Sequence, residues 1–206
     1  MNQRQLKIGL VGLVTAAVAG ATFSPAPAQA ALDDRSLAEV LAADKGYDRN
    51  WHDFDILEKA VTTVLKAKPN SPVSVLADGD TRLTAFLPTD AAFRRLVKDL
   101  SGKQPRTERA TFNAVAKVAD VDTLEAVLLY HVVPQRLNAK KVLKSDGAKL
   151  KTAANLNITV RVKGKKVKLI DKDRDAQNPR VVAVDINKGN KQIAHAINRV
   201  LRPIDL

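Results

Sequence analysis

The chain has 206 residues, no cysteine and a formal net charge of +12, from 34 Lys and Arg against 22 Asp and Glu. Without cysteine the protein can have neither disulfides nor a cysteine-linked lipid anchor, so its fold must rest on a hydrophobic core. The positive charge favours anionic partners such as acidic polysaccharides, wall polymers, membrane surfaces or nucleic acids, or it serves only solubility. Charge alone does not decide between these two roles.

The N-terminus has the layout of a secretory signal peptide. Arg4 and Lys7 precede an uncharged apolar run over residues 8–21, and an A-x-A pattern ends at Ala30. The run has 14 residues, fewer than the roughly 20 that span a bilayer, so we expect cleavage and no membrane span. The sequence therefore predicts a secreted, extracellular protein, free or associated with the cell wall, whose mature chain carries a charge of +10 once the two N-terminal cations are removed.

The first half of the mature chain has mainly helical periodicity. Apolar residues recur every three or four positions after Ser36 and through residues 53–67, where Lys68-Pro69 ends the pattern. Short apolar runs bounded by turn residues predict strands at 73–76 and 82–87, the second one buried. Further helices are predicted after Pro88 and around 111–118 and 123–129.

The second half, from about Lys140, has the alternation of β-strands. Residues 158–163 and 166–170 alternate around Gly164-Lys165, and a glycine in first place favours a type II′ hairpin turn. Strands are also predicted at 180–186 and 193–201. Because helices come first and strands follow, the predicted fold class is α+β and not a parallel α/β sheet.

Three segments resemble the fasciclin (FAS1) domain. TAFLPTDAAF, from Thr84 to Phe93, is similar to the first family signature, LLYHVVP (128–134) to its tyrosine–histidine motif, and IAHAINRVLRP (193–203) to the second signature. The resemblance covers residues 52–204, after a helical lead-in over 31–51 and the signal peptide over 1–30. It implies a wedge of strands in two sheets flanked by helices, in an extracellular adhesion or interaction module that is not generally enzymatic.

Asp90, in the first signature, has three interpretations. Thr89 or Asp90 can cap the helix that follows Pro88, because the first N–H groups of a helix lack partners within it. Alternatively, Asp90 contacts a partner, or it takes part in catalysis. Resemblance to animal family members, whose tyrosine–histidine motif is linked to integrin binding, adds Tyr130 and His131 to the candidate binding residues, although a structural role for the histidine competes with this.

Catalysis and metal binding have little basis in the residue pattern. An Asp–His pair needs a nucleophile, and the chain has no cysteine and no G-x-S-x-G motif. His52, His131 and His195 lie far apart in the sequence, and neither H-x-x-x-H nor C-x-x-C occurs. We therefore predict no catalytic residue, no metal site and no cofactor.

A basic stretch is the main feature that the resemblance does not explain. Ten Lys or Arg and one acid, Asp146, lie between Lys140 and Ile170. Alternation predicts one outward basic face, formed by Arg161, Lys163, Lys166 and Lys168, with Lys165 at the tip of the hairpin. The stretch has no aromatic residue that could stack on bases, so specific nucleic-acid binding is not predicted.

Two functions follow as hypotheses. The first is a secreted, non-enzymatic interaction or adhesion module that binds an extracellular or cell-surface protein. The second is binding of an anionic polysaccharide or wall polymer through the basic hairpin. A competing interpretation of the hairpin is that its lysines only protect a sheet edge against aggregation.

Overall fold

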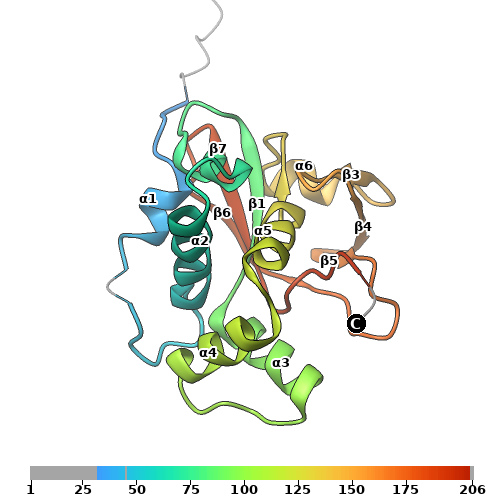
Figure 1. Cartoon of the computed structure of the whole chain (residues 1–206). Helices are drawn as coiled ribbons and strands as arrows, with labels where there is room; N and C mark the ends of the chain where they lie inside the picture. The colour runs from blue at the N-terminus through green and yellow to red at the C-terminus, as the bar shows by residue number, and fades with distance from the viewer. Residues whose placement is uncertain (1–31, 45, 205–206) are drawn as a thin grey trace, which may run out of the picture. The chain divides into compact units, whose positions relative to one another are not determined.

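The computed structural model describes residues 32–44 and 46–204, which form two β-sheets flanked by helices (Figure 1). This arrangement confirms the α+β prediction. The predicted signal peptide lies outside the described residues. The helical elements are α1 (Leu37–Leu41), α2 (Asp55–Ala67), the 3₁₀-helix η1 (Pro72–Ala77), α3 (Asp90–Ser101), α4 (Glu108–Val118), α5 (Val121–Tyr130) and α6 (Ala139–Leu143).

The two sheets divide the strands by position in the chain. The larger sheet has the order β2-β1-β7-β6, and the smaller has the order β3-β4-β5. Only β1 and β7 are parallel, and the other pairs are antiparallel. The strands are β1 (Leu83–Pro88), β2 (Val132–Val133), β3 (Lys149–Lys151), β4 (Asn157–Lys163), β5 (Lys166–Ile170), β6 (Val181–Ile186) and β7 (Gln192–Ile197).

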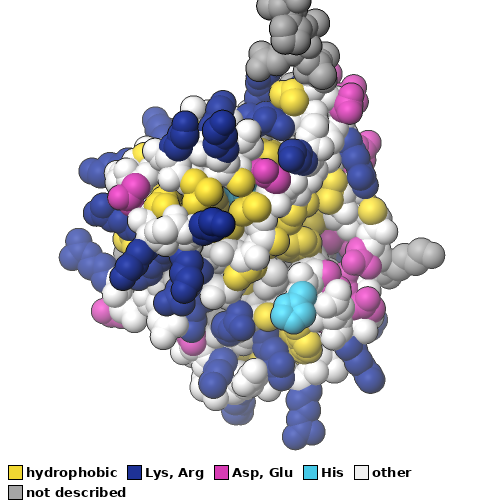
Figure 2. Space-filling model, turned by 180° about the vertical axis from the view of Figure 1, so that it is seen from behind, with side chains coloured by type: hydrophobic (Ala, Val, Ile, Leu, Met, Phe, Trp, Pro, Cys, Tyr) yellow, Lys and Arg dark blue, Asp and Glu magenta, His cyan; other side chains and the backbone are white. Residues whose placement is uncertain are grey.

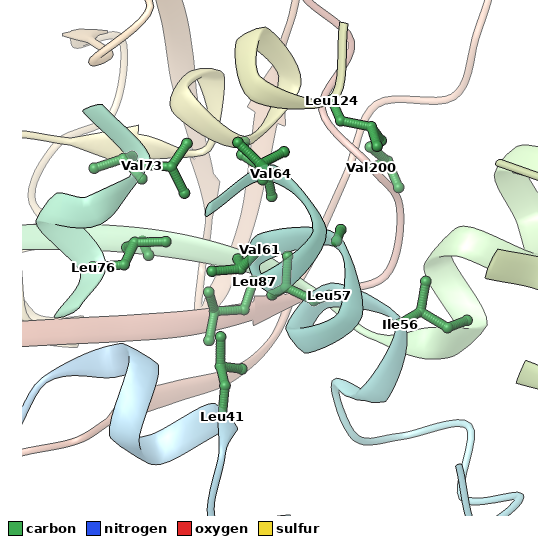
Figure 3. Packing of buried hydrophobic residues seen from close by; sticks show 14 of the residues in the cluster. Leu41, Ile56, Leu57, Val61, Val64, Val73, Leu76, Leu87, Leu124 and Val200 are labelled. Carbon is green, nitrogen blue, oxygen red and sulfur yellow. The ribbon is translucent and has the colours of Figure 1, made fainter. Parts of the chain in front are cut away.

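The larger sheet separates two hydrophobic cores. All six residues of β1 and of β7 are buried, because apolar side chains cover both faces of these central strands. On one face, Leu83, Ala85 and Leu87 join the helices of the first core, part of which is shown in Figure 3. On the other face, Phe86 and Ile197 pack in the second core with the inward residues of β4 and β5.

Three elements differ from the prediction, one of them the strand predicted at 193–201, which ends at Ile197. Residues 73–76 form part of the 3₁₀-helix η1 and not a strand, because Pro72 stands at its start and the Ser71 hydroxyl accepts a hydrogen bond from the Val73 N–H. Alternation alone could not distinguish four apolar residues of a short helix from a strand. In addition, the turn of helix α6 precedes the β-strands of the second half, capped by the Asn138 side chain.

The lead-in before residue 52 packs into the first core. A capping box at Ser36 starts α1, and Leu37 is fully buried. The buried amide of Gln192 accepts a hydrogen bond from the Leu37 N–H at 2.8 Å and donates to the Val75 and Asp78 carbonyls at 2.7 Å each. One side chain of β7 thus joins the lead-in and η1 to the sheet.

Candidate functional site

Asp90 lies at the point where two helices begin. It is the first residue of α3, it is fully buried, and its Oδ1 accepts a hydrogen bond from the Ile56 N–H of α2 at 3.0 Å. The N-cap of α2, Phe54, contributes no side-chain hydrogen bond, so Asp90 supplies the cap from a distant part of the chain.

The predicted capping of α3 by Thr89 or Asp90 side chains is therefore wrong. Thr89 is the N-cap residue, but it makes no side-chain capping bond. Instead, the Asp90 and Ala91 N–H groups donate to the carbonyls of Asp53 and Trp51, at 3.0 and 2.9 Å. Carbonyl groups of the loop before α2 thus accept hydrogen bonds from the first N–H groups of α3. In return, a side chain of α3 accepts a hydrogen bond from an N–H group at the start of α2.

The carboxyl groups of Asp90 and Asp53 face each other. As two carboxylates they have no donor between them, and both Asp53 oxygens and the Asp90 Oδ2 are without a hydrogen-bond partner. Burial raises the pKa of both groups, and Asp90 is raised the further of the two. We therefore place a proton on Asp90, which lets it donate to the Asp53 carboxylate.

Other acids surround this pair, and the sequence interpretation missed them. Asp55 and Glu108 are buried, and both oxygens of Asp55 and one oxygen of Glu108 have no hydrogen-bond partner. The Tyr47 hydroxyl also has none. Burial, helped by the charge of Asp53, raises the pKa of Asp55 to about 6. The sequence does contain a signal, because four Asp fall within residues 44–55, but such a cluster lacks the fixed spacing by which histidine and cysteine metal motifs are identified.

His131 has both ring nitrogens engaged inside the protein. Nδ1 lies 2.7 Å from the Val127 carbonyl, and Nε2 lies 2.9 Å from the Leu201 N–H. These partners fix the tautomer, with Nδ1–H donating and Nε2 accepting. Burial lowers the pKa of His131 to about 4, so the ring is neutral at pH 7. It joins α5 to the segment that follows β7.

Tyr130 is equally enclosed. Its hydroxyl donates to the Asn157 carbonyl at 3.2 Å, which links α5 to the first residue of β4, and burial raises the pKa of the phenol. Asp90, Tyr130 and His131 expose 0%, 0% and 4% of their surface. No hydrogen bond joins any two of them, so this structure brings them together neither as a catalytic pair nor as a contact surface.

The basic hairpin has the geometry that alternation predicted. Arg161 pairs with Lys168 and Lys163 with Lys166 across β4 and β5, so their side chains share one face. Gly164 has φ +60° and Lys165 has a negative φ, which fits a type II′ turn and not a type I′ turn. The opposite face carries Ile158, Val160, Val167 and Leu169 into the second core.

The structure extends this face beyond the hairpin. Lys149 and Lys151 of β3 lie across from Thr159 and Asn157, and Arg180 forms an isolated bridge with Lys168. Seen from behind, Lys and Arg side chains crowd the side of the molecule that carries the smaller sheet (Figure 2). We call the following exposed residues the basic face: Lys149, Lys151, Arg161, Lys163, Lys165, Lys166, Lys168 and Arg180.

No ion pair neutralises the basic face within the part of the chain that the structure describes. The six ion pairs found there involve Lys68, Lys191, Arg199 and Arg202. Asp146, the one acid nearby in the sequence, accepts a hydrogen bond from the Val162 N–H instead. Like charges that lie opposite each other on neighbouring strands repel, so this face holds unbalanced positive charge.

A family model for the fasciclin domain matches residues 57–203. The chain belongs to the fasciclin domain family. Domains of this family are adhesion and interaction modules of extracellular or cell-surface proteins and are generally not enzymes. Among the described residues, no helix has the length and hydropathy of a membrane span.

One solved structure similar to this fasciclin domain is a FAS1 domain pair from the insect cell adhesion molecule fasciclin I, with a TM-score of 0.45 and 20% sequence identity. The similarity covers 69% of this chain and 44% of that chain, so the present chain matches less than half of the length of the domain pair. A comparison with curated proteins gave no significant match.

Proposed function

We propose that this fasciclin domain is a secreted, non-enzymatic adhesion module that binds anionic polysaccharides or wall polymers at the cell surface or in the extracellular matrix. The basic face is its binding surface. The observation that carries this proposal is the register of β4 and β5, which sets exposed cations directly opposite each other with no acid between them.

Geometry and charge support a linear polyanion as the partner. The backbones of paired cationic residues on neighbouring strands are about 5 Å apart, and residues i and i+2 of one strand are about 7 Å apart. Several anionic groups of one polymer chain can therefore be bound at once. Polymer binding would also offset the repulsion between Arg161 and Lys168 and between Lys163 and Lys166. The smaller sheet is rigidly placed, because its other face belongs to the second core.

For Asp90, Tyr130 and His131 we propose an indirect role. Their hydrogen bonds join α2 to α3, α5 to β4, and α5 to the C-terminal segment. In this proposal they hold the domain that presents the binding surface and do not touch the partner themselves.

Retention on immobilised heparin tests the proposal. Replacing Lys163, Lys165, Lys166 and Lys168 by Glu should abolish retention at about 0.15 M salt, where the Debye length is about 8 Å. The matched control replaces Lys98, Lys103, Arg106 and Lys117 by Glu, which changes the net charge equally on exposed positions of α3, α4 and the loop between them. An equal loss of heparin retention in the two variants would mean that retention depends only on net charge. Unchanged retention in the basic-face variant would mean that these lysines serve only to protect the sheet edge against aggregation. Tighter binding to duplex DNA than to heparin would assign the wrong partner class.

Secretion is tested separately. The protein recovered from the medium of a secreting host should begin at Ala31, as read by mass spectrometry of its N-terminal peptide. An intact N-terminus on recovered protein would contradict cleavage after Ala30.

A further inference from the structure

A second charged feature lies away from the basic face. Carboxylates from the loop before α2 and from α4 converge on Asp55, the first residue of α2. Their oxygens lie within 4.8 Å of one another in two groups that share Asp55, one with Asp44 and Asp53 and one with Asp48 and Glu108. We call these five residues the acidic cluster.

Buried oxygens in the acidic cluster point to a missing ligand. Asp55 and Glu108 are each 98% buried, with 2% exposed surface. Both carboxylate oxygens of Asp55 and the Oε1 of Glu108 have no hydrogen-bond partner. Buried carboxylates are normally paired or bound to a metal, because a bare charge away from water is costly.

For Asp48, Asp53, Asp55 and Glu108, no cation among the described residues fills this need. Arg109 stacks over the Tyr47 ring and Arg94 over the Trp51 ring. Among the described residues, no Lys or Arg forms an ion pair with Asp48, Asp53, Asp55 or Glu108. Glu108 is tied down only through its other oxygen, which accepts a hydrogen bond from the Arg49 N–H at 3.1 Å.

The donor set selects the kind of ion. All candidate ligand atoms are carboxylate oxygens, which suit hard cations, and zinc or copper would favour nitrogen or sulfur. Calcium binds oxygens at about 2.3–2.6 Å, so ligands on opposite sides of one ion are about 5 Å apart. The three oxygens of each group lie within 4.8 Å of one another, so one ion of this size can contact all three. Magnesium, at about 2.0–2.1 Å, would need a tighter and more regular cage.

We propose that the acidic cluster binds one calcium ion, with Asp55 as the central ligand. Asp44 and Asp48 are exposed, which gives the ion a path from solvent, and Asp55 and Glu108 hold it from the buried side. The ion joins the loop over residues 44–55 to α2 and α4. This binding is independent of the basic face.

Thermal unfolding of the full chain, freed of metal by chelation, provides the main test. Calcium should raise Tm in a saturable manner, by about 5 °C or more when it is ~100-fold above its Kd. Asp55→Asn and Glu108→Gln should lose this rise, and Asp34→Asn, an exposed acid outside the cluster, should keep it. An equal rise with NaCl at matched ionic strength would mean charge screening alone, and an equal rise with magnesium would contradict the choice of ion.

Terbium luminescence gives a readout that does not depend on stability. The only tryptophan, Trp51, lies between Asp48 and Asp53 in the sequence, so terbium bound in the cluster should emit when the indole is excited. Calcium should displace the terbium, and Asp55→Asn should bind at least tenfold more weakly. Absence of both sensitised emission and a calcium-dependent Tm would overturn the proposal.

Discussion

The Oδ1 of Asp90 accepts a hydrogen bond from the backbone N–H of Ile56 at 3.0 Å, across 34 positions of the chain. The aspartate of the first fasciclin signature thereby caps a helix that comes before the signature, not the one that the signature begins. The signature thus forms a joint between two helices.

Two similar substitutions of Asp90 should change the free energy of unfolding by very different amounts. Asp90→Ala leaves the buried Ile56 N–H without a partner and should lower the free energy of unfolding by about 2 kcal/mol. Asp90→Asn keeps an oxygen acceptor and can donate to Asp53, so its change should stay within ~0.5 kcal/mol. Urea unfolding of the two variants measures the difference. Equal destabilisation would show that the negative charge, not the hydrogen bond, is what matters.

His131 should make the fold sensitive to mild acid. Its pKa falls from an ordinary 6.5 to about 4 in the folded protein, so the unfolded chain binds the proton more readily. Its contribution is therefore fully present above about pH 6.5 and is lost as the pH falls toward 4, at a cost of roughly 3 kcal/mol. The measurement is the free energy of unfolding between pH 7 and 4, compared with His131→Gln. The variant should be less stable at pH 7 and should lack this component of the slope. Parallel curves would contradict the assignment.

Lys168 should separate stability from binding. It lies between Arg161 on β4 and Arg180, so Lys168→Glu turns the charge repulsion with these two neighbours into attraction. We expect the free energy of unfolding to rise by about 0.5–1 kcal/mol and heparin retention to fall. Lys98→Glu, on the exposed part of α3, is the control and should change neither by a comparable amount. A loss of stability in Lys168→Glu would argue against repulsion on the basic face.

Gly79 should control the docking of the lead-in. A Cβ added there would lie 1.5 Å from the carbonyl oxygen and 2.6 Å from the carbonyl carbon of Asp34, and backbone cannot yield as a flexible side chain does. Gly79→Ala should therefore displace the segment before α1, lower stability by about 1–3 kcal/mol and speed hydrogen exchange at the Leu37 N–H. Unchanged exchange at Leu37 would show that the lead-in tolerates the shift.

Much of this fold could be predicted from local patterns. The α2 stripe, the capped start of α1 and the β4–β5 hairpin each follow from a periodicity or a turn residue within a few positions. The outward basic face was predictable for the same reason, because a two-residue turn determines which side chains share a face. Those predictions needed no knowledge of distant neighbours.

The candidate sites depended on contacts that local patterns do not contain. Nothing in the sequence around Asp90 indicates that its partner is Ile56, and nothing around Lys168 indicates Arg180. Likewise, Glu108 reaches the loop of residues 44–55 only because α4 packs on α2. Such long-range placement decided whether Asp90, Tyr130 and His131 were exposed, and all three proved to be interior residues.

The place of β7 has a consequence for how the protein forms. This strand lies between β1 and β6 and pairs with β1 over six residues, although more than 100 positions separate the two strands in the chain. One of the two central strands of the larger sheet is therefore made after all the other strands described. Both cores contain residues of β7 or of the segment after it, so neither can close before the chain has been synthesised through β7. Folding should therefore be slow and governed by non-local contacts.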